Sequence, residues 1–510
     1  MENICLRKNE GGSLDPRATA WLLGLLGAFS FTAYWVLVSM ALNPKLSLAF
    51  NVKGAEYGGP LTWPSRWLHL ADISEDFRTW LFIFLMVALS LMWLGAIYLV
   101  RKDNRRSLAL IIVVAFGAFA LLFVFGPSFL SKDVFSYSFN GRSMSVYHSN
   151  PYLLAPAARQ HDIFYPLIGW KDNASVYGPV FNYISCAITR IAGDNIAANV
   201  LGFKLLAFLS YAACLPLVYS LTRRVSPGKE NMALAISAWC PVLVMHILGA
   251  GHNDALMVAL LLGGYLLYRK GYLLSGIAIV LVAVMVKVVA AVALAPMLLL
   301  YVRDKQGAPL KRLVKAGAMV IVVPLVLYLP FLHSLEIFKA TAQMSKLYSN
   351  ASVPRLLSFE YKKVLKRGGI AAAEAARVAN ARVHLLFLAV FAIAAIVLLS
   401  RVRDYRSMVA CSAALFLTWF LTSSYVLPWY LASGLMLAAV AGWNLTTATL
   451  VGASAVFSLW RIPGPPTGEH PGEVTLYIAL PFLLLLLGWF AISTASWLAA
   501  HLVLTRPPSG

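Results

Sequence analysis

The sequence predicts an all-α polytopic membrane protein, built as a bundle of about 12–14 transmembrane helices. Hydrophobic residues make up 60% of the 510 residues and charged residues only 12%, whereas soluble domains carry about 25% charged residues. Apolar runs of about 20 residues recur along the chain, and each is long enough to cross a bilayer core of roughly 30 Å. We therefore interpret residues 1–510 as a single integral membrane domain.

The candidate spans follow one another with short connections. The first is too long for a signal-peptide core and lacks a clear cleavage site, so we expect it to be retained. The run 272–302 is too long for one ordinary span and carries Lys287 in its middle, where a charge is costly. We therefore predict two short helices that meet near Lys287. The predicted spans are 20–42, 79–100, 107–127, 197–221, 231–249, 254–268, 272–286, 288–302, 313–331, 383–400, 407–425, 429–442, 444–460 and 474–499.

The charged connections predict the orientation of the bundle. Short Lys- and Arg-rich connections share one side, which the positive-inside rule makes cytoplasmic. The outer side then receives a loop at 128–195, with a re-entrant or interfacial helix at 178–193; a true crossing by that helix is the alternative. The outer loop 332–382 is also basic, and we expect it to hold an anionic phosphate or lipid headgroups. The basic connections are 101–106, 223–229, 269–270, 303–312 and 401–406.

Unusual polar residues gather at span ends on this outer side. Asp133 follows the third span, and "GHND" at 251–254 follows the fifth. Together with Lys287 they place two carboxylates, an imidazole and an ammonium at one membrane face, which suits chemistry on a lipid-linked substrate. Simpler roles remain open: Asn253 or Asp254 as a helix cap, and Lys287 as a contact to lipid headgroups.

The chemistry open to such a site is limited. The chain carries no nucleotide-binding motif, so a sugar donor must arrive already activated and membrane-anchored, as a polyprenyl-phosphate sugar does. Transfer to a hydroxyl needs a general base, for which Asp133 is the candidate. Basic side chains would neutralise the departing phosphate. The aromatic residues that could stack on sugar or polyprene are Tyr137, Tyr152, Tyr177, Trp429 and Tyr430.

These residues also resemble a known family. "SKDVFSY" around Asp133, followed by "NGR", "NPY" and "YGP", resembles membrane glycosyltransferases of the C superfamily (GT-C). The nearest group is the polyprenyl-phosphomannose-dependent α-1,6-mannosyltransferases of actinobacterial lipoglycan synthesis. "GHNDALMVALLLGGYLL" is similar to that group's middle section and "YVLPWYL" to its late section. The resemblance covers roughly 125–305 and 418–431.

The resemblance implies a GT-C-type bundle and an inverting transfer of a sugar, mannose first, from a polyprenyl-phosphate donor to a glycan or glycolipid acceptor. It places the protein in the bacterial inner membrane with its active site facing the periplasm. By resemblance, Asp133 is catalytic and Lys287 lies at a helix break. Asp133 departs from the paired acids of many GT-C enzymes because it stands alone. The expected substrate-binding residues are Tyr137, Arg142, Asn150, Tyr152, Tyr177, His252, Asn253, Asp254, Lys287, Trp429 and Tyr430.

Other readings stay open at this point. A transporter or flippase for a lipid-linked oligosaccharide is the main alternative, and a transferase that adds a phosphate group to a lipid is another. The expected partners are the donor, the acceptor and membrane lipids; the net charge of +21 is attributed to lipid headgroups and not to nucleic acid. The sequence requires no cofactor and leaves a divalent metal open. It does not determine the sugar, acceptor, linkage or oligomeric state.

Overall fold

The computed structural model of the chain describes residues 15–42, 49–50, 59–70, 72–303, 308–344, 347–349 and 352–459. These residues form nineteen α-helices, several short 3₁₀ or π turns, and one two-residue antiparallel pair, β1 (Ala49–Phe50) with β2 (Ser128–Phe129). The prediction of an all-α polytopic membrane protein is confirmed. The predicted span at 474–499 lies outside the described residues.

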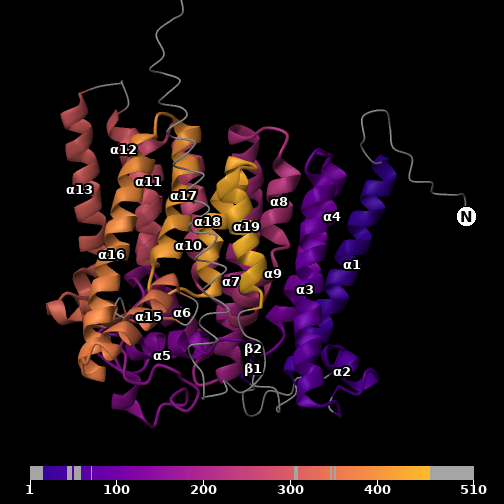
Figure 1. Cartoon of the computed structure of the whole chain (residues 1–510), viewed down its shortest axis with the longest axis horizontal. Coiled ribbons are helices and arrows are strands. Elements are labelled where there is room, and N and C mark those ends of the chain that lie inside the picture. The colour runs from indigo at the N-terminus through magenta and orange to yellow at the C-terminus, as the bar shows by residue number, and fades with distance from the viewer. Residues whose placement is uncertain are drawn as a thin grey trace, which may run out of the picture.

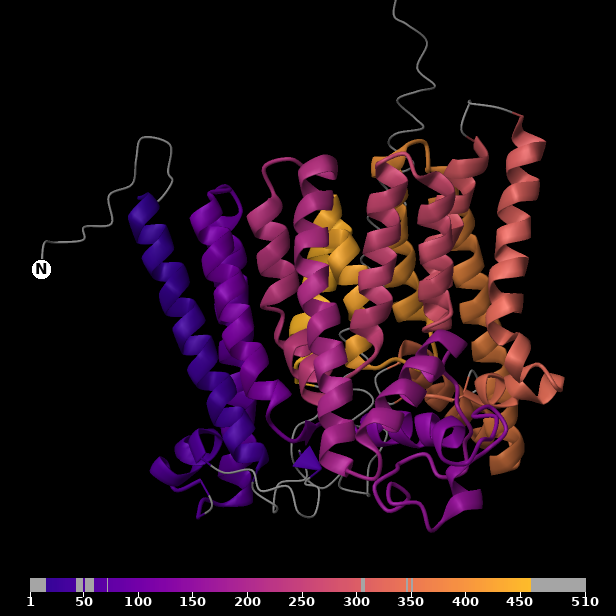
Figure 2. The same ribbon diagram turned by 180° about the vertical axis from the view of Figure 1, so that it is seen from behind.

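The long helices stand side by side along one common direction (Figures 1 and 2). Each predicted span that falls on described residues coincides with one of them or with a bent pair. Their bounds are α1 (Pro16–Ala41), α3 (Glu75–Val100), α4 (Arg106–Val124), α7 (Ile196–Val225), α8 (Glu230–Ala238), α9 (Pro241–Leu243), α10 (Asp254–Arg269), α11 (Leu273–Val284), α12 (Ala291–Arg303), α13 (Pro309–Tyr328), α16 (Ala372–Ser400), α17 (Tyr405–Thr422), α18 (Leu431–Ala441) and α19 (Leu445–Phe457).

A second group of short elements lies at one end of this bundle. Figure 1 places α2, α5, α6, α15 and the strand pair there. The basic connections before α4, α8, α11 and α17 lie at the opposite end, as Figure 2 shows from behind. The short helices and the basic connections therefore lie at opposite ends of the bundle, as the charge pattern predicts. The short helices are α2 (Trp63–Trp67), α5 (Asp133–Ser145), α6 (Pro179–Ala192), α14 (Lys339–Met344) and α15 (Val353–Arg367).

The helices differ in whether they could cross a membrane alone. Among the described residues, six are long and apolar enough: α1, α3, α4, α7, α13 with its following turn, and α16. A seventh is the pair of Glu230–Ala238 and Pro241–Leu248, which is bent by 45°. The remaining predicted spans form shorter helices, several of which end near the cavity described below. The 14-residue α6 is also short, and whether it re-enters the membrane or lies on its surface stays a prediction.

Local sequence sets where the helices begin and break. Asp15 caps α1 by accepting a hydrogen bond from the Arg17 backbone N–H at 2.7 Å, and a proline occupies the first turn. Lys287 interrupts the long apolar run: α11 ends at Val284, Lys287 is extended, and a 3₁₀ turn precedes α12. The predicted break near Lys287 is confirmed.

Lys204 fixes the turn that follows α4. Its Nζ is buried and donates to three backbone carbonyls, those of Phe123 at 2.6 Å, Gly126 at 2.7 Å and Pro127 at 2.7 Å. Carbonyls at a helix C-terminus have no partner within the helix. One side chain from α7 therefore satisfies the end of α4 and holds the segment that leads toward Asp133.

We expect Lys204→Met to destabilise the protein strongly, because three buried carbonyls lose their donor at about 1–3 kcal/mol for each group left unsatisfied. The measurement is thermal unfolding in detergent. Unfolding is monitored by a fluorescent reagent that reacts with the buried thiols of Cys214, Cys240 and Cys411 as they become exposed. Lys229→Met is the control, since Lys229 is only half-buried and bonds a single carbonyl, that of Arg101. Equal midpoints for the two variants would contradict the assignment.

Candidate active site

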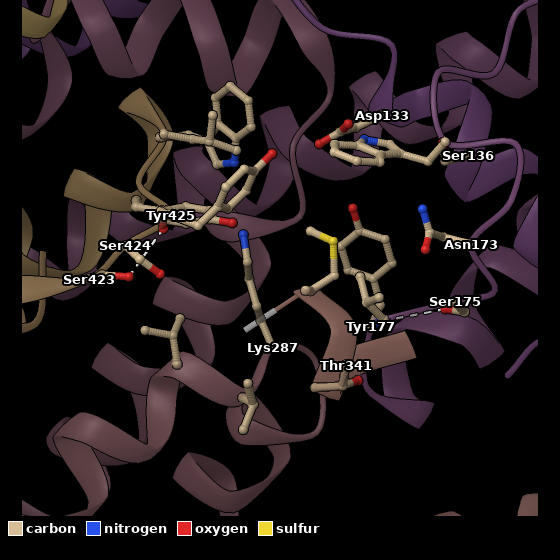
Figure 3. Close-up of a pocket in the computed structure, with 18 of the residues that line it drawn as sticks. Asp133, Ser136, Asn173, Ser175, Tyr177, Lys287, Thr341, Ser423, Ser424 and Tyr425 are labelled. Carbon is tan, nitrogen blue, oxygen red and sulfur yellow. Dashed lines mark hydrogen bonds between the residues drawn. The ribbon is translucent and has the colours of Figure 1, made fainter. Parts of the chain in front are cut away.

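A cavity of about 740 Å³ is lined by residues of α5 and of the loop before α6, which lie at one end of the bundle. Its wall is assembled from the start of α5, the loop 169–177, the helix break at Lys287, α14, α16 and the segment 422–430 before α18. Figure 3 shows side chains from these segments directed into one space. Because the segments are far apart in the sequence, the cavity exists only in the folded bundle.

Asp133 stands at the first position of α5. The chain reaches it from β2 through Leu130, whose φ of 62° is unfavourable for a residue with a branched side chain. The Asp133 backbone N–H donates to the Ser131 hydroxyl at 3.2 Å. Its side chain is 18% exposed and its carboxylate faces the cavity (Figure 3). A carboxylate in the first turn of a helix is favoured in its ionised form by the helix dipole.

His252 contacts Asp133 from behind the cavity wall. The imidazole Nδ1 lies 3.2 Å from the Tyr137 hydroxyl and 3.6 Å from Asp133 Oδ2. Its ring stacks on Trp429 with centroids 3.7 Å apart and planes at 21°. The side chain is fully buried in the turn before α10. These contacts fix the ring, so that Nδ1 points at the carboxylate and the phenol.

The buried environment indicates which nitrogen of His252 carries the proton. Among the described residues, Nε2 has no hydrogen-bond partner. A proton on Nε2 would leave a buried donor unsatisfied, at a cost of about 1–3 kcal/mol. A proton on Nδ1 would instead face the Tyr137 oxygen and the Asp133 carboxylate, and only a shortening from 3.6 Å is needed for a hydrogen bond to Asp133. The two acceptors facing Nδ1 favour the Nδ1–H tautomer, in which Nε2 is an acceptor without a partner among the described residues.

Burial, followed by the nearby charge of Lys287 and by His246, holds the pKa of His252 well below its usual range. The imidazole is therefore neutral in the folded protein, whereas an unfolded histidine takes up a proton near pH 6.5. Stability that depends on neutral His252 is present above that pH and is lost as the pH falls, because the unfolded chain binds the extra proton.

We accordingly expect the thermal midpoint of the wild type to fall more steeply between pH 7 and pH 5 than that of His252→Phe, which keeps an aromatic ring on Trp429. The same comparison with His161→Phe, at an exposed position, controls for the loss of a histidine elsewhere. Parallel pH profiles for the wild type and His252→Phe would contradict a neutral buried imidazole.

Lys287 brings a positive charge to the same cavity. Its Nζ donates to both carboxylate oxygens of Asp254 at 2.9 Å and lies 4.3 Å from the centre of the Tyr430 ring. The Asp254 side chain is 1% exposed and that of Lys287 is 15% exposed. An ammonium has three N–H donors, so the pair leaves Lys287 able to bind an anion from the cavity side. Figure 3 shows its side chain directed into this space, near Tyr177 and Tyr425.

The loop wall and the helix break are joined through their backbones. The Gly178 N–H donates to the Val286 carbonyl at 3.1 Å, and the Val180 N–H to the Met285 carbonyl at 3.1 Å. A Cβ at position 178 would overlap the Met285 backbone, so only glycine fits. Tyr177 and Lys287 are thereby held at a fixed separation across the cavity.

The remaining wall combines an apolar group of side chains with the polar residues Thr341, His384 and Ser424. It includes side chains from the 3₁₀ turn after Lys287, from α14, from α16 and from the segment before α18. Two of its members, Val288 and Leu388, are 64% and 55% exposed. A polar pocket thus continues into an apolar surface. The apolar lining residues are Val288, Val289, Met344, Phe387, Leu388, Phe391 and Leu427.

The predicted site residues fall into three groups. Five line the cavity directly: Asp133, Tyr177, Lys287, Trp429 and Tyr430. Three support these from behind: His252 contacts Asp133 and Trp429, Asp254 pairs with Lys287, and the ring of Tyr137 packs edge-on against Tyr177. Asn253 is buried beside them, and neither its side-chain nitrogen nor its oxygen has a partner among the described residues.

Three other predicted residues form the third group, which neither lines the cavity nor supports the residues that do. Arg142 is buried and forms ion pairs with Asp162 at 2.8 Å and Asp194 at 2.6 Å, which tie α5 to the following loops. The Asn150 side chain donates to the Phe331 carbonyl at 2.9 Å. Tyr152 packs in a small separate cluster against Phe331. All three connect the outer loop to itself or to the chain that follows α13.

Other lining residues were not predicted. Trp170, Asn173 and Ser175 come from the outer loop, and Ser423, Ser424 and Tyr425 belong to the segment "SSYVLPWY" at 423–430. Both segments were recognisable as polar insertions between apolar runs, but nothing in their spacing separates lining residues from their neighbours. The apolar α16 residues give no signal because they lie within an ordinary apolar span, whereas His384 was visible as a polar residue at the start of that span and was not predicted to line the cavity.

The basic cluster of the loop 332–382 lies on α15. Its Lys362, Lys363, Lys366 and Arg367 do not line the cavity, and Lys363 pairs with Glu360 at 2.8 Å. Of the described residues of this loop, only Thr341 and Met344 of α14 line the cavity. Contact of these four residues with lipid headgroups stays a prediction.

The fold and this cavity together define a polytopic membrane protein whose polar site lies at one end of a helix bundle and opens beside an apolar wall. The chain belongs to the MptA_B family, because residues 48–303, about half of its length, match the family described as alpha-(1->6)-mannopyranosyltransferase, N-terminal domain. The match contains Asp133, His252, Asp254 and Lys287. The family predicted from the sequence is confirmed.

Individual relatives agree with this assignment. The chain is 32% identical over 174 residues to alpha-(1->6)-mannopyranosyltransferase A of Corynebacterium glutamicum, covering 34% of this chain and 35% of the relative. It is 24% identical over 276 residues to alpha-(1->6)-mannopyranosyltransferase B of the same organism, covering 52% and 44%. It is 29% identical over 203 residues to the A protein of Mycobacterium tuberculosis, covering 38% of each. The matched regions span less than half of each relative.

Proposed function

We propose that this protein is an inverting mannosyltransferase that moves mannose from a polyprenyl-phosphate donor to a hydroxyl group of a glycan or glycolipid, forming an α-1,6 linkage. The observation that carries the proposal is that the Asp133 carboxylate and the Lys287 ammonium face one cavity, whose lining also includes a group of apolar side chains from the 3₁₀ turn after Lys287, α14 and α16. A lipid-linked sugar phosphate requires this combination of a base, a cation and an apolar surface. Family membership supports mannose as the sugar and α-1,6 as the linkage.

In the proposed step, the acceptor oxygen attacks the anomeric carbon of mannose as the bond from that carbon to the phosphate oxygen breaks. Asp133 accepts the proton of the acceptor hydroxyl, and polyprenyl phosphate leaves with the bonding electron pair. Lys287 binds the phosphate, whose negative charge grows as the bond breaks. Attack in line with the leaving group inverts the anomeric centre, so a β-linked donor gives an α-linked product.

His252 has a supporting role in this proposal. Its Nδ1–H can donate to Asp133 and orient the carboxylate oxygen that takes the proton. The stacked Trp429 keeps the ring in that orientation and also lines the cavity, where it offers a face to a sugar ring. The side-chain amide of Asn253 lies beside this group, and neither its nitrogen nor its oxygen has a hydrogen-bond partner among the described residues.

The proposed location is the bacterial inner membrane, with the cavity on its outer face. The basic connections at the opposite end of the bundle support this orientation, since such connections remain cytoplasmic. Reporter fusions after residues 104, 227 and 404 should read cytoplasmic, and fusions after 160 and 360 periplasmic. A cytoplasmic signal at 160 would contradict the proposed location of the cavity on the outer face of the membrane.

The direct test uses purified protein in detergent, with polyprenyl-phosphate mannose and a short mannoside acceptor. We expect an elongated mannoside and free polyprenyl phosphate, with no product when GDP-mannose replaces the donor. Turnover without a sealed vesicle distinguishes an enzyme from a flippase, which would move lipid across vesicles and form no new glycosidic bond. The same assay with a chelator tests for a divalent metal; no cofactor is part of this proposal. The proposal would be overturned if folded wild-type protein transferred no sugar from any of a range of lipid-linked sugar phosphates.

A further inference from the structure

We propose that a second cavity, at the end of the bundle opposite Asp133, binds the phosphate of an anionic membrane-lipid headgroup. This cavity has a volume of about 500 Å³. It lies between the turn 271–275 that joins α10 to α11, Tyr301 of α12, and the beginning of α13. The proposal is independent of the glycosyl-transfer chemistry.

Three cations converge on this cavity. Lys311, Arg312 and Lys315 all line it, and among the described residues no aspartate or glutamate does. Arg312 is held in place, since its guanidinium donates to the Tyr301 carbonyl at 2.9 Å and lies 5.2 Å from the Tyr301 ring centre. Lys311 and Lys315 are four positions apart on one helix, an arrangement in which like charges repel. A bound dianion or phosphodiester would relieve that repulsion.

The surroundings of the cavity favour a lipid over a free phosphate ion. The helix α13 is barely covered by the rest of the protein, since only 6% of its most apolar 18-residue stretch is buried. Leu310, Leu313 and Val314, which are interleaved with the cations, are 71%, 56% and 62% exposed. A ligand seated here would place its phosphate on the three cations and its acyl chains along α13. Basic pockets between membrane helices hold anionic headgroups in this way.

A basic connection elsewhere on the same end provides the matched control. Arg101, Lys102 and Arg106 lie around the turn between α3 and α4, and all three are exposed. They carry the same total charge as the cavity triad but line neither cavity. If the triad served only to orient the bundle in the membrane, the two sets would behave alike toward lipid.

The experiment compares wild-type protein, the triple variant K311Q/R312Q/K315Q and the control R101Q/K102Q/R106Q. Each is purified in detergent and titrated with phosphatidylglycerol, phosphatidylcholine or inorganic phosphate. Bound lipid is counted by native mass spectrometry, and the thermal midpoint is followed in parallel. We expect the wild type and the control to retain phosphatidylglycerol with a saturable stabilisation, and the triple variant to bind it on the order of tenfold more weakly or worse.

A second variant keeps the test valid if the triple variant folds poorly. Ser275→Trp fills the cavity from the α11 side and leaves every cation in place, so it should block the same lipid. Equal phosphatidylglycerol binding by the wild type and both cavity variants would overturn the proposal. So would an equal loss in the control variant, or saturation by inorganic phosphate alone, which would identify a free-anion site instead.

Discussion

Asp133→Asn should insert and fold like the wild type yet lose turnover by on the order of 10²-fold or more, because removing a general base costs that much in proton transfer. The asparagine keeps the size of the side chain and can still accept a hydrogen bond from the His252 Nδ1–H. It lacks the basic oxygen that takes the acceptor proton. We therefore expect kcat to fall with little change in the KM for donor, as for an interaction made in the transition state.

The matched control is Asp172→Asn, an identical change at an exposed position of the same outer loop that does not line the cavity. Asp133→Glu retains the charge but moves it by about one methylene, and partial activity is expected because the base must lie within about 2.6–3.2 Å of the hydroxyl oxygen. Turnover is normalised to folded protein, measured by size-exclusion chromatography. Substantial normalised turnover in Asp133→Asn would make this residue a structural partner of its neighbours and not the base.

Lys287→Met should show the second large effect, in both stability and donor binding. The variant leaves the carboxylate of Asp254, which is 1% exposed, without its cation. Breaking a buried pair from one side costs about 3–5 kcal/mol. It also removes the ammonium that faces the cavity, so the KM for donor should rise and kcat should fall. Lys171→Met is the matched control, because Lys171 also lies over an aromatic ring, 4.6 Å from the centre of Tyr165, in the outer loop.

The double variant Lys287→Met with Asp254→Asn separates the two contributions. Removing both charges of a buried pair together is often nearly neutral for stability, so the double variant should recover most of the lost thermal midpoint. Its activity should stay low, because no cation faces the leaving phosphate. Recovery of turnover along with stability would show that Lys287 serves the fold alone.

Much of this architecture could be predicted from local pattern. Apolar runs give the helices directly, because a membrane-crossing segment must satisfy its own backbone and be long enough. The break at Lys287 could also be predicted, since a lysine in the middle of an apolar run is too costly to bury unpaired. The identity of its partner could be proposed only from the clustering of charges on one face, and the structure places Asp254 there.

The side-chain roles were harder to predict because they depend on packing between distant segments. Arg142 looks like a phosphate ligand in the sequence, yet Asp162 and Asp194 reach it from two separate loops. Asn150 and Tyr152 belong to the same turn and are bonded toward the chain after α13. The apolar α16 residues of the cavity wall, Phe387, Leu388 and Phe391, are invisible in sequence, since an apolar residue that faces a pocket looks like one that faces lipid.

The backbone bonds from Gly178 and Val180 to the segment 285–286 set an order for the assembly of this protein. The chain inserts from its N-terminus, so the loop with Asp133 and Tyr177 is made before α7, α8, α10 and α11. The acceptors for Gly178 and Val180 become available only when α11 has been inserted and the residues before Lys287 emerge. Until then these two N–H groups lack their partners, and buried backbone groups must be paired. A nascent chain halted before Met285 would therefore hold the loop with Asp133 and Tyr177 without these two bonds, whatever the state of the helices already in the membrane.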